Sequence, residues 1–305
     1  MIASPALARM PTMFRIAQIS DTHLSAAKPY FVENFELVCE AVLRAGLDML
    51  VNTGDISLDG AGYEQDLIDA AELHRHFPLP VRTVPGNHDI GDNADVPARA
   101  GHAQPVVDAA RRARYLKHFG DDWWRFDLPG WRIVGLNSLI LGSDLPEAQA
   151  QAEFLREAAT GAGSRRLALF AHKPLCDADL GETAVGGRFL NPGPRRALLA
   201  ALAGVVPAVI ACGHVHQYRD ARIGGTRHVW APSTGFTLPD ALQPRYGVKR
   251  LGYVEHRFAA DGSHDCALIE TPETEAHCII DFPDAYGSLR EDDALHLREM
   301  ERAMA

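Results

Sequence analysis

The chain has 305 residues, and its balance of 47% hydrophobic and 23% charged residues is that of an ordinary globular protein, with no reason to expect disorder. The formal net charge of −10 argues against the basic surface of a sequence-independent nucleic-acid binder, so we expect no long nucleic acid as a partner. A small anionic substrate would need a local source of positive charge. Bound metal ions, often the largest charges in a site, are the obvious source.

Cysteine spacing and hydropathy set further limits. The five cysteines are scattered and show no C-x-x-C spacing, so we expect no disulfide framework. No apolar run approaches the ~18 residues of a membrane span, and the chain does not open with an apolar block behind a basic end. We therefore expect no membrane partner and a cytoplasmic location. The sequence does not fix the oligomeric state, and a homo-oligomer is compatible with it.

The chain length fits one α/β domain with a short appendage. We expect the main domain over 14–270 and a partly helical C-terminal extension over 271–305. Residues 285–305 are charged and helix-prone, which is typical of a solvated or subunit-packing tail, and they carry no chemistry that we identify.

In chain order, the first third alternates strands with helices. Apolar runs and spacings near 3.6 predict strands over 14–20, 47–53 and 81–84, and helices over 32–45 and 63–77. Each strand ends in a polar turn, and the last turn reads "PGNHD". The stretch 90–105 is rich in Gly, Asp, Asn and Pro, which predicts a long loop over one rim.

The alternation then repeats along the chain. We expect helices over 106–119, 147–159 and 195–202, strands over 166–172 and 209–212, and two strands around Pro129-Gly130. Residues 181–194 hold four glycines and two prolines and predict a second rim loop. Beyond Tyr218 the short runs "TRHVWA", "LGYVEHRF" and "CALIET" are joined by glycine turns, which predicts a second, more antiparallel sheet.

Five strand ends carry oxygen and imidazole groups. In order they are Asp21-Thr22-His23, Gly54-Asp55, Gly86-Asn87-His88-Asp89, His172 and Gly213-His214-Val215-His216. Singly, these residues have structural explanations as helix caps, turn formers or hydrogen-bonded core groups. Together they favour a ligand site, because ligands of open α/β sheets bind beyond the carboxyl ends of the strands. Oxygen and imidazole ligands without thiolates suit Mn, Fe or Zn.

This succession of motifs resembles the calcineurin-like metallophosphoesterase superfamily, whose pattern is D-x-H, G-D, G-N-H-[DE], H and G-H-x-H. Every element is present in order over 21–216, about two thirds of the chain. The resemblance implies an α/β fold in which two mixed sheets flanked by helices form an α/β/β/α sandwich. It also implies that 14–270 is the catalytic domain.

The resemblance further implies two divalent or transition metal ions, Mn, Fe or Zn, with Asp55 between them. One ion would be held by Asp21, His23, Asp55 and His216, and the other by Asp55, Asn87, His172 and His214. The two histidines of "GHVH" would then serve different ions. Residues i and i+2 of a strand point to the same face, and leaving the strand at Gly213 relaxes that constraint.

The resemblance also implies the roles of the remaining motif residues. A hydroxide bridging the two ions would be the nucleophile of an in-line displacement at phosphorus. His88, which is not a ligand in the family pattern, would stabilise the transition state or protonate the leaving oxygen. Asp89 would orient the His88 ring by accepting its other N–H.

Three segments, "VPGNHD", "AHKPL" and "CGHVHQ", resemble the bacterial branch that contains class III cyclic-nucleotide phosphodiesterases and glycerophosphodiesterases. The segment "GDISLDG" lacks the D-R-G ending of Ser/Thr protein phosphatases, and with it an arginine that would grip a phosphomonoester. We therefore expect hydrolysis of small phosphodiesters. His102 in the first rim loop and Arg188 in the second are candidate substrate contacts, because loops often carry function.

Two alternatives remain open on the sequence. A phosphomonoesterase or a nucleotide pyrophosphatase would use the same two-metal motifs, so only a substrate panel separates these enzymes from a diesterase. A catalytically idle metal-binding regulator is the alternative from another class. Retention of the whole ligand set and of His88 argues against it.

Overall fold

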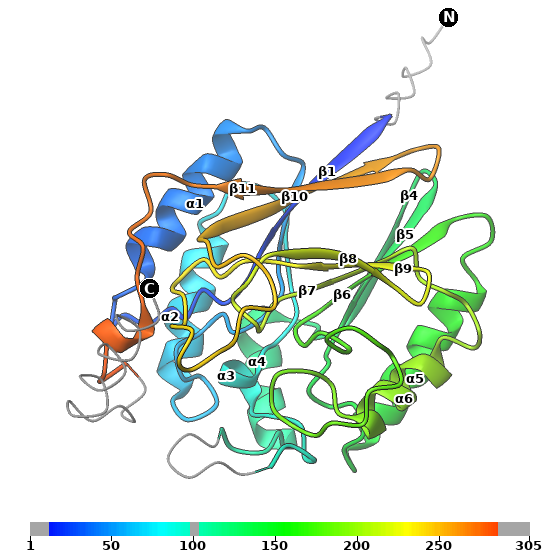
Figure 1. Ribbon diagram of the computed structural model, residues 1–305, viewed down its shortest axis with the longest axis horizontal. Coiled ribbons are helices and arrows are strands. Elements are labelled where there is room, and N and C mark those ends of the chain that lie inside the picture. The colour runs from blue at the N-terminus through cyan, green and yellow to red at the C-terminus, as the bar shows by residue number, and fades with distance from the viewer. Residues whose placement is uncertain (1–11, 98–103, 286–305) are drawn as a thin grey trace, which may run out of the picture.

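The computed structural model describes residues 12–97 and 104–285, which form two sheets packed face to face with helices outside them (Figure 1). The first sheet has the order β11-β10-β1-β2-β3. Its strands are β1 (Met13–Ile19), β2 (Met49–Asn52), β3 (Val81–Thr83), β10 (Gly252–Ala259) and β11 (His264–Glu270). Strands β1, β2 and β3 are parallel, whereas β10 is antiparallel to both of its neighbours.

The second sheet has the order β4-β5-β6-β7-β9-β8. Its strands are β4 (Trp124–Leu128), β5 (Trp131–Leu136), β6 (Arg166–Ala171), β7 (Val209–Cys212), β8 (Arg219–Ile223) and β9 (Thr226–Trp230). The four central strands are parallel and the two edge strands are antiparallel to them. Both sheets are therefore mixed, as the resemblance implied.

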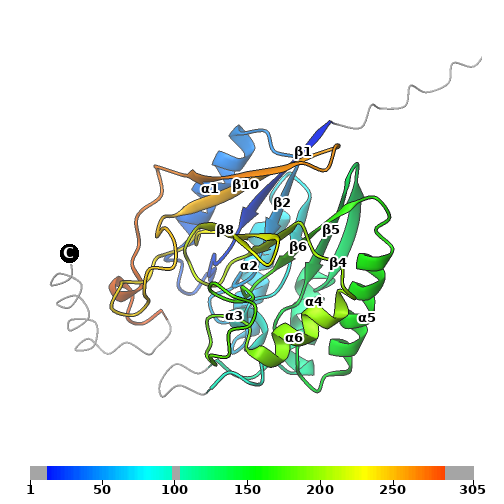
Figure 2. The ribbon, with the colours of Figure 1, turned by 45° about the vertical axis from the view of Figure 1, so that its right-hand side comes forward.

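Helices cover the outer face of each sheet. They are α1 (Val32–Arg44), α2 (Glu64–Arg75), α4 (Ala109–Phe119), α5 (Pro146–Thr160) and α6 (Pro192–Ala201), while the single-turn helix α3 (Asn87–Ile90) lies in the turn after β3. Apolar residues of α1, α2 and α4 pack against β1 and β2, and α5 and α6 pack against the second sheet (Figure 2). A third apolar cluster fills the space between the sheets. The α/β/β/α sandwich is confirmed.

The strand residues alternate between these cores, as the two-residue period of a strand requires. On β1, Ala17 and Ile19 face the helices while Ile16 faces the second sheet. Helix α6 begins at Pro192, three residues before the predicted start, because proline is well suited to the first turn of a helix, where its missing N–H costs nothing.

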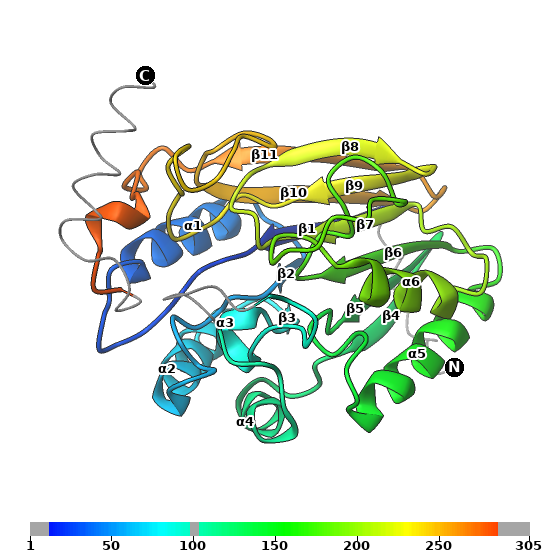
Figure 3. The ribbon, with the colours of Figure 1, turned by 60° about the horizontal axis from the view of Figure 1, so that its bottom comes forward.

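The prediction of a separate antiparallel sheet after Tyr218 is wrong. Strands β8 and β9 extend the second sheet, whereas β10 and β11 extend the first. Figure 3 shows β8 and β9 beside β10 and β11, and Arg227 of β9 donates to the backbone carbonyl of His264 at 3.1 Å. Strand β8 was not predicted because its sequence, "RDARI", is a polar edge strand with little apolar signal. Periodicity identifies strands but does not choose their partners.

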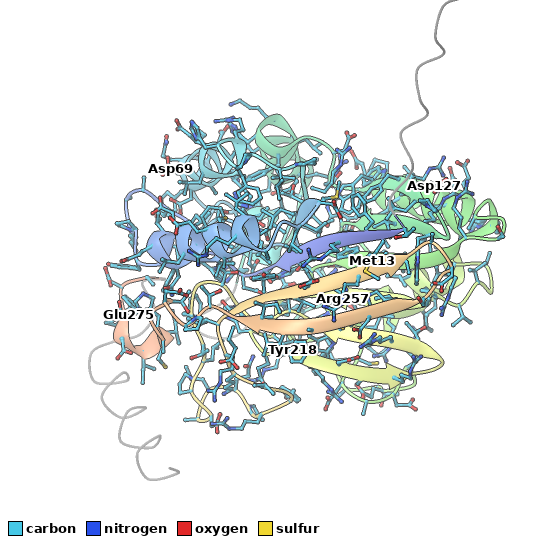
Figure 4. The ribbon with its side chains drawn as sticks, turned by 90° about the horizontal axis from the view of Figure 1, so that it is seen from above. Met13, Asp69, Asp127, Tyr218, Arg257 and Glu275 are labelled. Atoms are coloured by element: carbon cyan, nitrogen blue, oxygen red, sulfur yellow. The ribbon has the colours of Figure 1, made fainter. Side chains whose placement is uncertain are left out.

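The described part of the predicted extension packs on the domain. The backbone N–H of Thr237 donates to the carbonyl of His277 at 2.9 Å, and the N–H of Ile279 donates back at 3.1 Å. Ile279 lies in a single turn of 3-10 helix, η1 (Ile279–Asp281), whose apolar residues join Phe31 and Phe236 in one cluster. Glu275 lies at the end of the sheets opposite Asp127 (Figure 4). Of the charged 285–305 stretch, only Ala285 is among the described residues.

Within the described ranges, no helix has the length and the apolar character that crossing a membrane requires. All five cysteines are free thiols, as their spacing predicted.

Candidate active site

The structure brings the seven predicted ligand residues together at one end of the sandwich. Asp21, Asp55 and Asn87 follow β1, β2 and β3 of the first sheet, while His172 and His214 follow β6 and β7 of the second. Among the residues that the structure describes, possible ligand atoms within 4.8 Å of one another form three groups: Asp21, His23 and His216; His23, Asp55 and His88; and Asp55, His172 and His214. Because the groups share His23 and Asp55, they form one continuous site.

The first group joins the end of β1 to the turn after β7. His216 Nε2 lies 3.3 Å from Asp21 Oδ1 and 3.3 Å from His23 Nε2. The side chains of all three residues are almost fully buried. Ligand atoms of two residues that follow the first sheet and of one that follows the second therefore converge.

The third group is centred on His172. Its Nε2 lies 3.3 Å from Asp55 Oδ2, 3.1 Å from Asn87 Oδ1 and 3.0 Å from His214 Nδ1. His214 and His216 thus belong to different groups, and their binding of different ions, which the resemblance implied, stays a prediction.

Backbone carbonyls fix the histidine rings. The Nδ1–H of His172 donates to the Thr53 carbonyl at 2.8 Å, and that of His216 donates to the Phe236 carbonyl at 2.9 Å. His214 is turned the other way, with its Nε2 2.8 Å from the Gly187 carbonyl. A carbonyl only accepts, so these contacts place the hydrogen on the outer nitrogen and leave the lone pair of the other nitrogen facing the site.

The backbone at the site is unusual. In the described chain six non-glycine residues have a positive φ, and five of them are predicted ligands: Asp21 (54°), His23 (47°), Asp55 (49°), His214 (69°) and His216 (56°). Left-handed backbone is disfavoured for residues with a Cβ and concentrates at functional sites. The fold therefore holds these side chains in conformations that local sequence preference alone opposes.

The glycine of "GNHD" is required by a close approach. A Cβ at Gly86 would collide with the backbone nitrogen and the carboxylate of Asp55. At Gly54, φ is +100° and a Cβ would lie 2.7 Å from both Gly86 N and His172 Nδ1. Gly86 thus lets the turn after β3 pack against Asp55, and Gly54 lets the turn after β2 approach both Gly86 and the His172 ring.

The electrostatics of the buried site favour a positive charge beside Asp55. Burial lowers the pKa of His172, but the Asp55 carboxylate outweighs burial and raises that pKa to about 9. Burial raises the pKa of Asp55, yet His172 and His88 outweigh it and hold that pKa well below its usual range. Burial, followed by repulsion from neighbouring histidines, lowers the pKa of His23 and His214. An anionic Asp55 and neutral imidazoles are the forms that bind metal.

His88 lies at the junction of the two outer groups. Its backbone N–H donates to Asp55 Oδ1 at 2.8 Å, and its ring stands 4.8 Å from the ring of His23 at 85°. Its Nδ1 contacts the Leu58 carbonyl at 3.0 Å and Gln104 Nε2 at 3.1 Å. His88 is thus placed as close to the site as the predicted ligands are.

The prediction that Asp89 orients the His88 ring is wrong. The Asp89 carboxylate is fully buried and accepts hydrogen bonds from the backbone N–H groups of Ile56, Ser57 and Gly86 and from the Ser57 hydroxyl, at 2.6 to 3.1 Å. These donors satisfy both of its oxygens. Asp89 therefore ties the turn after β3 to the segment that follows Asp55.

The two candidate substrate contacts have different outcomes. His102 lies outside the described residues. Arg188 donates to the Tyr246 hydroxyl at 3.1 Å and to the Leu242 carbonyl at 2.7 Å, with its guanidinium 5.7 Å from the centre of the Tyr246 ring. These contacts brace the second rim loop beside Gly187, and a substrate contact of Arg188 stays a prediction.

Sequence reasoning missed two side chains at the site. The Phe236 ring packs 4.6 Å from His216 and 4.9 Å from His23 and forms an apolar wall, although nothing in "TGFTLP" marks it. Lys173 is fully buried and pairs with Asp92, which joins the end of β6 to the first rim loop. In the sequence it is marked only as part of the segment "AHKPL", without a role of its own.

A cavity of about 500 Å³ lies elsewhere, between α2, β3 and α4. None of the predicted site residues lines it. We place the active site at the ligand groups, because their convergent polar atoms and shifted pKa values carry the chemistry.

Similarity to known proteins agrees with this geometry. The family profile described as calcineurin-like phosphoesterase matches residues 14–218. The 3′,5′-cyclic adenosine monophosphate phosphodiesterase CpdA of Escherichia coli (strain K12) is 30% identical over 290 residues, which cover 88% of this chain and 90% of that protein.

Solved structures of low identity share the fold. A dimetal phosphatase from Danio rerio has a TM-score of 0.53 at 16% identity, covering 80% of this chain and 92% of that one. GAP50, the anchor in the inner membrane complex of Plasmodium, has a TM-score of 0.58 at 12% identity, covering 87% of each chain. The family match spans more than half of the chain and includes every ligand group. The chain therefore belongs to the calcineurin-like phosphoesterase family and is a metal-dependent phosphoesterase.

Proposed function

We propose that this protein hydrolyses small phosphodiesters at a site that holds two divalent metal ions. The observation that carries the proposal is the set of three ligand groups joined into one site through His23 and Asp55. The 30% identity to a cyclic adenosine monophosphate phosphodiesterase supports cyclic nucleotides as the substrates to test first.

The donor set fits metal ions. In both His172 and His216 the Nδ1–H donates to a backbone carbonyl. In the neutral ring, Nε2 therefore carries a lone pair that faces the site. Each Nε2 faces a carboxylate oxygen at 3.3 Å, which also only accepts. Such acceptors repel one another at this distance unless a proton or a metal cation lies between them. The raised pKa of His172 reports the same demand for positive charge.

We assign the ligands as the motifs predicted. Asp21, His23, Asp55 and His216 would hold one ion, and Asp55, Asn87, His172 and His214 the other. When bound, two divalent ions supply positive charge for the phosphoryl group and activate the attacking water at neutral pH. Carboxylate, amide and imidazole ligands accept several transition metals, and Mn, Fe and Zn are the ions to compare.

The chain's own groups complete the site. The Nδ1 of His88 lies 3.0 Å from the Leu58 carbonyl, and His88 offers a ring nitrogen within 4.8 Å of possible ligand atoms of His23 and Asp55. From there His88 stabilises charge on the phosphoryl group or protonates the leaving oxygen. The Phe236 ring restricts water on the His216 side, since it covers two of the imidazoles.

The charge pattern favours diesters over monoesters. A dianionic monoester gains most from an additional cation such as a bidentate arginine. The loop "GDISLDG" supplies none. Arg188, the arginine beside the Gly187 carbonyl that holds His214, is engaged with Tyr246 and Leu242. A singly charged diester therefore suits the site better.

The test couples metal analysis to a substrate panel. The purified full-length chain is stripped with a chelator and reloaded with Mn²⁺, Zn²⁺ or Fe²⁺. Then kcat/KM is measured for 3′,5′-cyclic AMP, a glycerophosphodiester, bis-p-nitrophenyl phosphate and p-nitrophenyl phosphate. We expect two ions per chain, loss of activity on stripping, and faster hydrolysis of the diesters. A monoester preference with every metal would overturn the diesterase proposal, and two bound ions without hydrolysis of any ester would favour an idle regulator.

A further inference from the structure

The apolar core between the two sheets contains a buried chain of polar side chains. Gln18 of β1 and His256 of β10 are both fully buried among residues such as Val51, Phe170 and Val254. The His256 ring packs 5.5 Å from that of Phe170, on the opposite sheet. A polar group in such a core is costly unless it is hydrogen-bonded. The positions of its partners therefore indicate what the group does.

The side-chain amide of Gln18 hydrogen-bonds to three other segments, which are the end of β2, the end of β7 and strand β10. Its Nε2 donates to Thr53 Oγ1 and to the Cys212 carbonyl, each at 3.1 Å. Its Oε1 lies 2.9 Å from His256 Nε2, which donates to it because an amide oxygen only accepts. Thr53 belongs to the end of β2 in the first sheet, and Cys212 ends β7 in the second.

These partners directly precede metal-ligand turns. Thr53 precedes Gly54-Asp55, and its carbonyl accepts the Nδ1–H of His172. Cys212 precedes Gly213-His214, and the Gly213 N–H donates to the His172 carbonyl at 2.9 Å. Gln18 itself is three residues before Asp21. One amide thus spans the two sheets directly behind the ligands that each sheet contributes.

We propose that Gln18 is a positioning residue that sets the distance between the two halves of the metal site. Asp21, His23, Asp55 and Asn87 come from the first sheet, whereas the other ligands come from the second. The apolar packing between the sheets is non-directional, but a hydrogen bond has a narrow range of length and angle. The Gln18 amide therefore fixes the relative position of the strand ends more tightly than the surrounding core does.

A second contact fixes the direction of the amide. Because His256 Nε2–H donates to Gln18 Oε1, His256 Nδ1 accepts from His264 Nε2 at 3.0 Å. Burial lowers the pKa of both histidines, that of His264 to about 3, so both rings stay neutral and keep this direction of donation. A reversed Gln18 amide would place its NH₂ group against a donor. The amino group consequently stays aimed at Thr53 and Cys212.

This inference rests on the two-metal site of the proposed function, and the first readout of its test, metal binding, needs no substrate. The variant is Gln18→Met, which keeps the length of the side chain and removes its hydrogen bonds. The matched control is Gln151→Met on α5, because Gln151 is equally buried and its amide bonds only to the backbone of Asn137. Both full-length variants are titrated with Mn²⁺, and exchange coupling between the two ions is followed by electron paramagnetic resonance.

We expect Gln18→Met to weaken binding of the second ion and to lower kcat, each by about 10-fold to 100-fold, the range for residues that orient metal ligands. The coupled Mn²⁺ signal should change with it. Gln151→Met should lower thermal stability but leave the signal and kcat at wild-type values. Wild-type coupling and kcat in Gln18→Met would overturn the proposal, as would equal changes in both variants.

Two further measurements keep the outcome decisive. If Gln18→Met does not fold, Thr53→Val removes one of the two acceptors while preserving side-chain shape, and it should cause a smaller change in the same direction. A wild-type coupled signal in Thr53→Val would then overturn the proposal. If the wild-type protein binds two coupled ions but hydrolyses no diester, the proposed substrate fails while the role of Gln18 is still measured.

Discussion

At the scale of single residues, Asp55 has the most demanding position. It belongs to two of the three ligand groups, its Oδ1 accepts from the His88 backbone N–H, and its Oδ2 faces His172. Its backbone is left-handed, with a φ of 49°. A residue held in this conformation by its surroundings is hard to replace, because the fold supplies its geometry and the side chain supplies the charge.

We expect Asp55→Asn to lose one or both metal ions and nearly all activity, because the amide keeps the shape and removes the charge shared by both groups. Elemental analysis after dialysis measures the loss. Asp122→Asn is the control, since Asp122 is a buried carboxylate paired with Arg112 away from the ligand groups. It should lower stability and retain two ions. Two ions at wild-type affinity in Asp55→Asn would refute the bridging role.

His88→Ala should keep the metal ions and the fold while lowering kcat by roughly 100-fold to 10,000-fold, the usual range for a positioned acid or base. The decisive comparison uses two diesters that differ in leaving-group pKa. Loss of a general acid should slow the poorer leaving group more. Equal slowing of both would reject the general-acid role and leave electrostatic stabilisation by His88.

At the scale of elements, the segment around η1 supports the wall of the site. The Phe282 ring packs 5.3 Å from Phe31, which in turn packs 4.8 Å from Phe236. The Phe236 carbonyl fixes the ring of His216. The described part of the predicted extension therefore bears on one metal group through two layers of aromatic packing, although it is far from that group in sequence.

Phe282→Ala should cost about 1 to 3 kcal/mol of folding stability, less than a fully buried phenylalanine because the ring is only partly buried. It should also weaken metal binding at the His216 group, because Phe236 loses its support. Phe154→Ala is the control, since this partly buried ring packs on the core outside the second sheet. Urea unfolding and metal titration of both variants separate the effects. Equal metal affinities in the two variants would contradict the link to the site.

At the scale of the whole molecule, buried neutral histidines outside the active site link stability to pH. Burial is the largest cause of the lowered pKa of His74 and His228, each to about 4. His74 Nδ1 donates to the Ala70 carbonyl at 2.8 Å, and its Nε2 accepts from Asn52 at 3.1 Å. Asn52 in turn accepts from the Gly54 N–H, so protonation of His74 would disturb the turn before Asp55.

The sign of the pH effect follows from linkage. The unfolded chain protonates His74 near pH 6.5 and the folded chain near pH 4, so the stability from neutral His74 is present above pH 6.5 and is lost as pH falls towards 4. At pH 5 the loss is about 2 kcal/mol. His74→Gln should therefore be less stable than wild type at pH 7.5, and the difference should shrink by that amount at pH 5. The unfolding free energies of both proteins are measured in urea at each pH. A difference between wild type and His74→Gln that is the same at pH 7.5 and pH 5 would reject the assignment.

The sequence by itself predicted the residues that the structure brings together in the ligand groups. Buried parallel strands have strong apolar runs, and the carboxyl ends of neighbouring parallel strands meet at one edge of their sheet, so the polar turns after 14–20 and 47–53 were expected to lie together. The approach of the turn after 209–212, which belongs to the second sheet, was implied by the family resemblance alone. The same motifs indicated the family, and the family resemblance in turn implied the α/β/β/α sandwich. These are local patterns, and periodicity and turn chemistry report them directly.

Only the tertiary structure decided how those residues are held. The carbonyls of Thr53, Gly187 and Phe236 orient the histidines from loops distant in sequence, and any residue type carries a carbonyl, so no letter marks them. The tertiary structure also chose the partners of β8 to β11 and gave the Asp89 carboxylate to backbone donors in place of the His88 ring. Strand pairing and hydrogen bonding depend on which surfaces meet after folding. The order of residues along the chain does not say which distant segments come into contact.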